Sequence, residues 1–499
     1  MALLPINLRD LNGYSVKSDN INGTLCLRYV ARHYMVFGLT AFVVFMLLLG
    51  KLSFHEVIVE VPLAEQARPE SSRWSGLRLP PLYSQYHEHE LSLPQHRWHA
   101  AWHEGEPKFL FIPGHSRGSG WGNIWQEILL NAYLSYKLNR AFVFYNYTWN
   151  DDASQDYSDY GGKPIPSRVP LSALIAGPMV GGAFPGTDHH ASLSIAEQYY
   201  HTVCDGRKRV LDREEVHKDL GSWMVDSITE GWVRKLRTVD DQCVEVENSQ
   251  GPIYNWVTFG DKSAMRAAWA DFAASPVVST FRWSPLVELA FDNNREVVAP
   301  TTISEPPLSA LPYDTPNAGR YPAIPGLLVL HLRRGDYAGH CEHLAEWSST
   351  FLAFNQLPGL EDFTPPSGSA PWGENTPENT ALYRRRCLPT IPEVVARVRE
   401  VQQAHAARGL ENVYIMTNGA LSWVEKLKVA LTDMGGFKHV ASSRDTVLNW
   451  EQKYVAQAMD MLVGQRAQVF IGNGWSSLTG GIVVMRHANG FHADTTRFF

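Results

Sequence analysis

The chain has 499 residues, of which 44% are apolar and 19% charged, with a formal net charge of −7. This composition supports packed cores and excludes a wholly disordered chain, and the length exceeds that of one ordinary domain. The modest acidic charge offers no basic stripe of the kind that binds nucleic acid, and a mean hydropathy of −0.21 excludes a protein with many membrane spans.

One strongly apolar segment lies near the N-terminus. Residues 34–50 read YMVFGLTAFVVFMLLLG, and a helix of that length covers roughly 26 Å, close to the ~27 Å core of a thin bilayer. Arg28 and Arg32 precede it, and such charges favour a cytoplasmic flank. The segment predicts an uncleaved transmembrane signal anchor with residues 1–33 in the cytosol and the rest in the lumen of the Golgi or endoplasmic reticulum. A cleaved signal peptide and a buried core helix are the alternatives.

The chain beyond the anchor begins with a predicted stem and a first α/β unit. Residues 51–105 contain many prolines and little sustained periodicity, which favours a solvated stem. The first folded unit is placed at residues 106–325. An apolar strand over 109–112, a glycine-rich turn, a helix over 124–138 and a strand over 141–145 follow the order of a βαβ unit.

The last part of the chain, residues 326–499, alternates strands and helices. The expected strands cover 327–332, 413–416, 438–441 and 469–471, and the expected helices cover 391–408, 421–432, 450–464 and a stretch after Trp475. Strands separated by helices predict a parallel sheet covered on both faces. We therefore expect an α/β fold with two Rossmann-like domains that face a ligand-binding cleft. Residues 150–320, rich in Pro, Gly and Trp, are interpreted as insertions.

The sharpest motif is LLVLHLRRGDY, residues 327–337. Its apolar strand brings His331, Arg333, Arg334 and Asp336 near the strand's carboxyl end. Adjacent arginines beside a core are costly unless they meet anions, and a guanidinium can bind phosphate oxygens bidentately. Strand alternation places His331 and Arg333 on one face and Arg334 on the other, so one arginine can hold a phosphate while the other braces the loop. An ordinary arginine–aspartate bridge is the alternative.

Two further segments are suited to a phosphate or a sugar. PGHSRGSGWGN ends in Gly122 and Asn123, and its glycines let the backbone approach a ligand ahead of a helix N-terminus that favours anions. VFIGNGWSSLTGG ends a strand and places Ser476 and Ser477 at the start of a helix. Tight packing of the first segment and N-capping by the serines are the purely structural alternatives.

In this order the three segments resemble the fucosyltransferase superfamily that uses GDP-fucose, in particular its protein O-fucosyltransferase-like branch. The resemblance covers about 108–150 and 325–490, includes Asp460, and is poor over 150–320, where acceptor recognition can differ. The family implies a GT-B-like fold with the donor in the cleft between the domains. It also implies inverting transfer of fucose to a hydroxyl of a protein or glycan acceptor, with GDP-fucose as donor substrate and no metal or other cofactor.

The resemblance also implies roles for single residues. Arg333 would be the catalytic residue that holds the β-phosphate and assists its departure, with His331 beside it. Asp460 would contact the guanine. The other expected contacts to the donor are Gly122, Asn123, Arg334, Asp336, Ser476 and Ser477.

A reaction without a metal agrees with the residue pattern. The chain contains no Asp-x-Asp motif, which carries the metal in the other common glycosyltransferase architecture. The departing diphosphate then needs fixed positive charge, which is the role expected of Arg333. The catalytic base stays open between His115 and Glu127.

A lumenal location has consequences for cysteine pairing and glycosylation. We predict disulfides Cys204–Cys243 and Cys341–Cys387, one of three possible pairings of the four cysteines after the anchor. Asn146 opens an N-glycosylation sequon beside a predicted strand, so its use depends on the exposure of that strand end.

Two other functions stay open on the sequence alone. A membrane-anchored sulfotransferase would share the topology and a first loop rich in serine and glycine, but it would not need the arginine motif. A non-catalytic protein that binds a nucleotide-sugar or a glycan could use the same fold.

Overall fold

The computed structural model describes residues 74, 76–97, 107–114, 119–149, 155–182, 193–247, 252–254, 264–301, 305–366 and 376–499. These residues belong to one compact unit, Ser71–Phe499. The predicted tail and signal anchor, residues 1–50, lie outside them. In the described part of the chain, no helix combines the length and the apolar character needed to cross a membrane.

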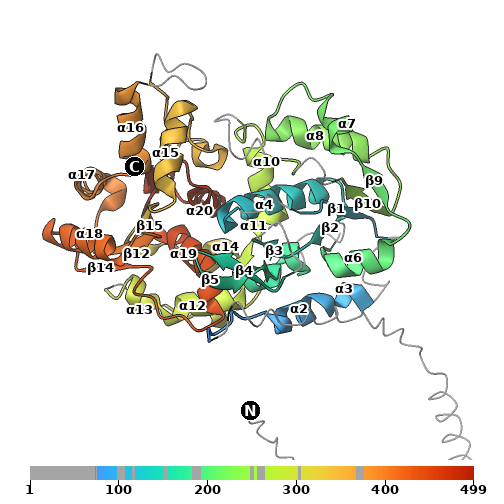
Figure 1. Cartoon of the computed structure of the whole chain (residues 1–499), viewed down its shortest axis with the longest axis horizontal. Coiled ribbons are helices and arrows are strands. Elements are labelled where there is room, and N and C mark those ends of the chain that lie inside the picture. The colour runs from blue at the N-terminus through green and yellow to red at the C-terminus, as the bar shows by residue number, and fades with distance from the viewer. Residues whose placement is uncertain are drawn as a thin grey trace, which may run out of the picture. The chain divides into compact units, whose positions relative to one another are not determined.

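The first half of the described chain is built on a five-stranded parallel sheet. Across the sheet its strands are β8 (Ile195–Ala196), β2 (Ala141–Phe144), β1 (Phe109–Phe111), β10 (Cys243–Val246) and β9 (Arg209–Leu211) (Figure 1). Helix α4 (Trp121–Lys137) connects β1 to β2 and confirms the predicted βαβ unit. It is buried on nearly all sides because it packs between this sheet and helix α20 of the other half.

The second half carries another five-stranded parallel sheet. Across it the strands are β14 (His439–Ser442), β13 (Asn412–Thr417), β12 (Ile324–Leu332), β15 (Ala467–Gly472) and β16 (Thr496–Phe498). The four predicted strands are confirmed, and so is the α/β class. The sequence analysis missed β16, whose residues Thr-Arg-Phe are too few to show a periodic pattern.

The predicted helices of the second half are present with shifted ends. They are α17 (Ile391–Gln402), α18 (Leu421–Asp433), α19 (Ala456–Gln465) and α20 (Ser477–Ala488). A capping box of Thr390 and Glu393 fixes the start of α17. The predicted helix over 450–464 divides, because residues 452–454 form a separate 3₁₀ turn before α19.

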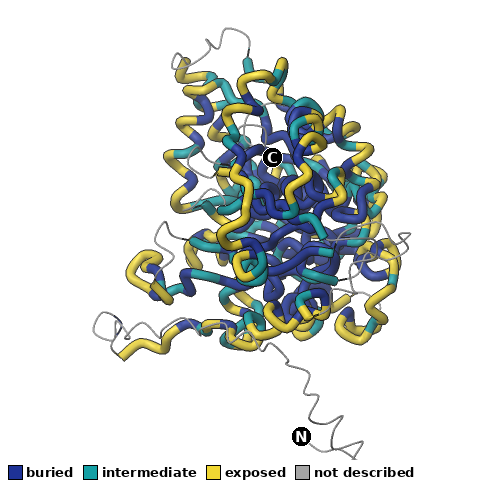
Figure 2. Tube along the Cα trace, turned by 90° about the vertical axis from the view of Figure 1, so that its right-hand side faces the viewer, coloured by how far each residue is buried: buried dark blue, intermediate teal, exposed yellow. Residues whose placement is uncertain are grey.

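Both halves share a hydrophobic core. One cluster of buried residues runs from Phe109 and Trp125 to Trp283 and Phe470, and so joins the two sheets through α4. A smaller cluster that includes Leu328 covers the other face of the second sheet. Figure 2 shows these buried segments enclosed by exposed helices. Because β12 is covered on both faces, it is a nearly continuous apolar run.

Part of the predicted stem is folded. The sequence analysis expects a solvated stem over 51–105, but α2 (Ser84–Leu91) and α3 (Pro94–Arg97) pack onto the protein. Buried Glu90 of α2 accepts a hydrogen bond from the Ser172 N–H at 2.9 Å. The Tyr83 hydroxyl, just before α2, donates to the Glu451 carbonyl at 2.7 Å. The periodic pattern misses this packing because its anchors are single residues in a polar stretch.

Both predicted disulfides are confirmed. Cys204 at the end of α6 (Glu197–Cys204) is bonded to Cys243 of β10. Cys341 of α15 (Tyr337–Glu346) is bonded to Cys387 at the end of α16 (Pro377–Cys387). The second bond joins α15 to α16 in the excursion that follows the arginine motif, a segment that interrupts the alternation of strands and helices.

Candidate active site

The three sequence motifs meet at one cavity. It has a volume of about 840 Å³ and lies where the carboxyl end of β12 approaches the N-termini of α4 and α20. Six of the nine predicted site residues border it, which are Gly122, Asn123, Arg333, Asp336, Ser476 and Ser477. Helix N-termini favour anions, so two helices and one arginine give this cavity the character of an anion site.

Arg333 is held at the cavity edge by its neighbours. Its Nη2 donates to Asp336 Oδ2 at 2.7 Å, and its guanidinium carbon lies 4.7 Å from the centre of the Tyr337 ring. Its Nε is buried without a hydrogen-bond partner. Nη1 makes no hydrogen bond to any residue described. The side chain is 28% exposed, so donors remain for an anion in the cavity.

Arg334 lies on the other side of the strand end and does not border the cavity. Its guanidinium carbon is 4.0 Å from the Trp423 ring centre, and it donates to the Pro389 carbonyl. Burial lowers the pKa of Arg334 to about 10. Asn418 accepts from the Arg334 N–H at 2.8 Å and donates to Asp336 at 2.8 Å. The two arginines, which follow the last residue of β12, therefore lie on different sides of the strand end, and Arg334 braces the loop.

His331 is buried beneath the site and does not border the cavity. Its Nδ1 lies 2.7 Å from the Thr479 hydroxyl, which also accepts from the Asn473 N–H at 3.1 Å. Burial, assisted by the charge of Arg333, lowers the pKa of His331 to about 3. The imidazole is therefore neutral and links β12 to the first turn of α20.

The paired serines do not cap their helix. Ser476 occupies the N-cap position of α20, yet its side chain makes no capping hydrogen bond. The Ser477 hydroxyl likewise has no partner among the described residues. The capping alternative is therefore wrong for Ser476, and both hydroxyls are free beside the cavity.

Asp460 of α19 does not border this cavity. Its Oδ1 accepts a hydrogen bond from the Tyr414 hydroxyl at 2.8 Å. Burial raises the pKa of Asp460 to about 7, against the opposing effects of that hydrogen bond and of the Arg444 charge. Its contact with a guanine base stays a prediction.

Comparison with known families finds one match. Residues 289–489 match the family described as GDP-fucose protein O-fucosyltransferase. This match indicates a glycosyltransferase. The matched segment contains the arginine and serine motifs that border the cavity.

Several solved fucosyltransferase structures are similar to the chain. The crystal structure of POFUT1 with GDP is 14% identical, and the match covers 79% of this chain and 99% of that one, with a TM-score of 0.44. The structure of POFUT1 with GDP-fucose is also 14% identical, and the match covers 79% of this chain and 98% of that one, with a TM-score of 0.43. The NodZ alpha-1,6-fucosyltransferase soaked with GDP-fucose is 10% identical, and the match covers 76% of this chain and 93% of that one, with a TM-score of 0.34. Comparison with curated proteins finds no match.

In this protein the glycine turn has a packing role. A Cβ on Gly122 would lie 2.5 Å from the backbone nitrogen of Leu478. The neighbouring Gln126 donates from Nε2 to the Ser477 carbonyl at 2.7 Å. Gly122 therefore lets the start of α4 lie directly against the start of α20, which supports the packing alternative, while the same residue borders the cavity.

Part of the cavity wall is aromatic, which the sequence did not predict. Tyr147 begins β3 (Tyr147–Thr148), and Trp149 directly follows this strand. Tyr160 is the last residue of β4 (Tyr157–Tyr160). The rings of Trp149 and Tyr160 meet edge to face, with centroids 5.3 Å apart. These strands belong to short antiparallel ribbons, which are too short to read from periodicity.

Of the two candidate bases, only Glu127 lies in the described part of the chain. Glu127 is buried in α4 and does not border the cavity, and His115 lies outside the described residues. His340, which the sequence analysis did not select, does border it. No group of three or more histidine, cysteine, aspartate or glutamate residues in the described ranges could hold a metal, and independence from metals stays a prediction.

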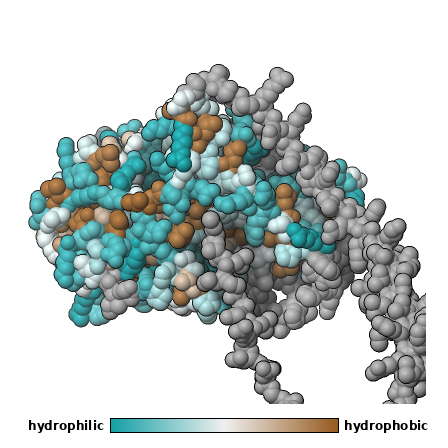
Figure 3. Space-filling model, turned by 90° about the horizontal axis from the view of Figure 1, so that it is seen from below, coloured by the Kyte–Doolittle hydropathy of each residue, from teal (hydrophilic) through white to brown (hydrophobic). Residues whose placement is uncertain are grey.

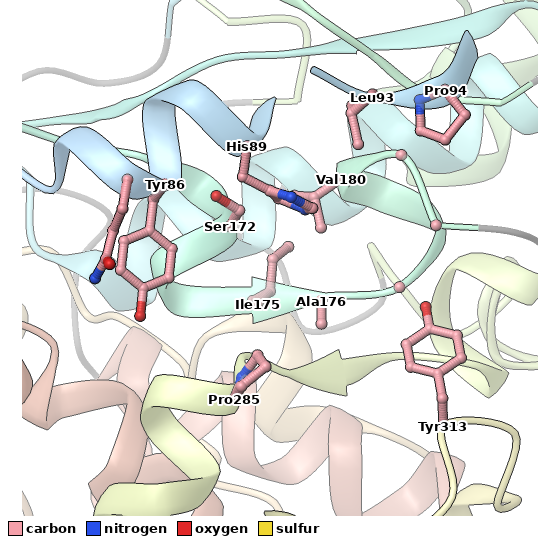
Figure 4. A pocket seen from close by; sticks show the side chains of 14 residues that line it. Tyr86, His89, Leu93, Pro94, Ser172, Ile175, Ala176, Val180, Pro285 and Tyr313 are labelled. Atoms are coloured by element: carbon pink, nitrogen blue, oxygen red, sulfur yellow. The ribbon is translucent and has the colours of Figure 1, made fainter. Parts of the chain in front are cut away.

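A second pocket of about 630 Å³ lies under α2 (Figure 4). Tyr86 and His89 of α2 form one side, and Tyr313 and β7 (Ile175–Ala176) form the other. None of the residues that line it is Asp, Glu, Lys or Arg, so it lacks the charge that a diphosphate requires. On the face of the protein that Figure 3 shows in colour, hydrophobic residues are scattered among hydrophilic ones.

Proposed function

We propose that this glycosyltransferase moves fucose from GDP-fucose to a hydroxyl of a protein or glycan acceptor, with inversion at the sugar carbon and without a metal. The observation that carries the proposal is the meeting of Arg333 with the free hydroxyls of Ser476 and Ser477 at one cavity. The family match supports the donor.

The chemistry follows from where charge develops. When the bond between fucose and the β-phosphate breaks, negative charge accumulates on the departing diphosphate. Arg333 borders the cavity and has unused donors, and the first N–H groups of α20 have no partner within the helix and suit an anion. Because Asp336 and Tyr337 hold Arg333 in place beforehand, little reorganisation is needed during the reaction.

The two sides of the cavity suit the two substrates. The arginine and serine side takes the diphosphate of the donor, and we place donor binding in the domain over residues 326–499. The aromatic wall of Tyr147, Trp149 and Tyr160 presents flat apolar faces and polar edges, which suit a sugar ring or a peptide segment of the acceptor.

We also place the enzyme in the secretory pathway, as a single-pass type II protein of the Golgi or endoplasmic reticulum. The two disulfides support an oxidising compartment. The apolar segment over 34–50 would supply the anchor.

A donor screen on the purified full-length chain tests the proposal. Release of GDP from GDP-fucose is measured with protein and glycan acceptors, with and without a chelator, beside other nucleotide-sugars and 3′-phosphoadenosine 5′-phosphosulfate. We expect turnover with GDP-fucose and with no other donor of the screen, at a rate that the chelator does not change. NMR should show a product of inverted anomeric configuration. Turnover of the sulfate donor, or binding of GDP-fucose without any GDP release, would contradict the proposal.

A further inference from the structure

His340 occupies a distinctive position in the cavity. It lies one turn into α15, and its ring centroid is 4.7 Å from that of Tyr337, the residue whose ring also contacts Arg333. It borders the cavity together with both of them. Neither of its ring nitrogens hydrogen-bonds to any residue that the structure describes, so a nitrogen lone pair is available to a substrate.

Besides His340, the cavity is bordered by one carboxylate and one amine of the described residues, and both are poorly suited to accept a proton. Asp336 uses one oxygen for Arg333 at 2.7 Å and the other for Asn418 at 2.8 Å. Lys453 is a cation that lies 5.4 Å from the ring centre of Trp450. A general base must present an unprotonated atom that is free to reach the acceptor, and these two groups do not.

The tyrosines that border the cavity are also unsuited. Burial raises the pKa of Tyr147, Tyr337 and Tyr454 above the ordinary value, so these three hydroxyls keep their protons at neutral pH. The fourth tyrosine of the cavity, Tyr160, carries no basic nitrogen. Among the described residues His340 is left as the one group of the cavity with an uncommitted basic nitrogen.

We propose that His340 is the general base that accepts the proton of the acceptor hydroxyl. The inference rests on the proposed function. The acceptor oxygen forms a bond to the anomeric carbon of fucose, and the bond from that carbon to the β-phosphate oxygen breaks. Its electron pair leaves with GDP beside Arg333, and the hydroxyl proton moves to the imidazole, which later releases it to water.

The surroundings of His340 favour its neutral form. Burial lowers the pKa of His340, the charges of Arg333 and His343 lower it further, and Asp336 opposes them. The neutral imidazole is the form that a base requires, and it persists at a pH below the ordinary histidine pKa of 6.5.

The remaining charged groups near α15 are engaged elsewhere or lie across the cavity. On the packed face of α15 and α16, Arg384 pairs with Glu342 at 3.7 Å. Lys453 and Tyr454 border the cavity from the η6 turn (Gln452–Tyr454).

The test compares His340→Gln with His343→Gln in the full-length chain. His343 lies on the same helix, its side chain is 58% exposed and bonded to Glu346 at 2.9 Å, and it does not border the cavity. The pH dependence of kcat for GDP release from GDP-fucose is measured both for hydrolysis, without an acceptor, and for transfer to protein and glycan acceptors. The affinity for GDP-fucose is measured by calorimetry.

We expect His340→Gln to lower kcat by about 10²–10⁴-fold while GDP-fucose affinity changes by less than about threefold. The wild-type rate should fall with acidification below pH 6.5, because protonation removes the base, and the variant should lack this fall. His343→Gln should keep the rate at neutral pH and the acidic fall, with the fall moved to a slightly higher pH because the charge of His343 lowers the pKa of His340. A His340→Gln enzyme with the wild-type rate and the same acidic fall overturns the inference.

Two further outcomes are separable. If wild-type protein neither binds GDP-fucose nor releases GDP, the proposed function fails, and the inference fails with it. If His340→Gln does not fold by thermal denaturation, the wild-type profile and His340→Ala with added imidazole decide. Recovery of rate by imidazole supports the base, and a wild-type kcat without an acidic fall overturns it.

Discussion

The guanidinium of Arg333 donates to the carboxylate of Asp336, with 2.7 Å between Nη2 and Oδ2. The two residues are three positions apart in the sequence, and the aspartate side chain is 61% exposed. Such a partly exposed ion pair adds little to stability. Its consequence is orientation. Asp336 is fixed in turn by Asn418, and the arginine is therefore aimed before any substrate arrives.

Replacing Arg333 by alanine should nearly abolish turnover. Removal of one preorganised donor to a developing anion typically costs about 10²–10³-fold in rate, and this is the decrease in kcat expected for GDP release. Arg399→Ala is the matched control, because Arg399 is exposed on α17 and lies outside the cavity. Equal rates in wild type and Arg333→Ala would remove the assignment.

Replacing Ser477 by alanine should weaken the binding of GDP. A hydrogen bond to a charged group contributes about 1.5–3 kcal/mol, so the dissociation constant for GDP should rise by roughly 10–150-fold, as measured by calorimetry. Ser422→Ala, at an exposed position of α18, should leave it unchanged. An unchanged affinity in Ser477→Ala would return the serine to a structural role.

The sequence was informative where one local pattern determines a structure. The apolar run of β12 predicted a strand covered on both faces, and Arg333 and Arg334, which follow its last residue Leu332, lie on different sides of the strand end as predicted. Four cysteines allowed three pairings, and the predicted one formed. These features depend on periodicity, strand geometry and a small number of combinations.

Other features depend on contacts between distant segments, which a single sequence does not reveal. His331 and Asp460 lie away from the cavity, where Thr479 and Tyr414 bind them, and their contacts with the donor stay predictions. The aromatic wall comes from two- to four-residue strands, and His340 lies in an excursion between predicted elements. Only the folded chain brings such residues to the site.

Replacing Gly122 by alanine should destabilise the contact of α4 with α20. The new Cβ would meet backbone atoms of Ser477 and Leu478 at 2.5–2.8 Å, and backbone cannot move aside as a flexible side chain does. Overpacking of this kind costs about 1–3 kcal/mol, to be measured by urea denaturation. Gly120→Ala is the control, since a Cβ there meets nothing within 4 Å, and equal stability of the two variants would contradict the packing role.

The buried carboxyl of Glu90 should make stability depend on pH. Glu90 is 4% exposed, and burial raises its pKa from the ordinary 4.5 to about 7, although the Ser172 N–H donates to it. Because the folded-state pKa lies above the unfolded one, its contribution is complete below about pH 4.5 and is lost as the pH rises through 7.

The variant Glu90→Gln isolates this effect, because an amide oxygen still accepts from Ser172 and cannot ionise. At about pH 4 the two proteins should unfold at similar urea concentrations. At about pH 8 the variant should be more stable by about 3 kcal/mol, the free energy of a shift of this size. Glu88→Gln, exposed on the same helix, should show no such difference. Curves for wild type and Glu90→Gln that stay parallel from pH 4 to pH 8 would mean that this carboxyl does not titrate in the fold.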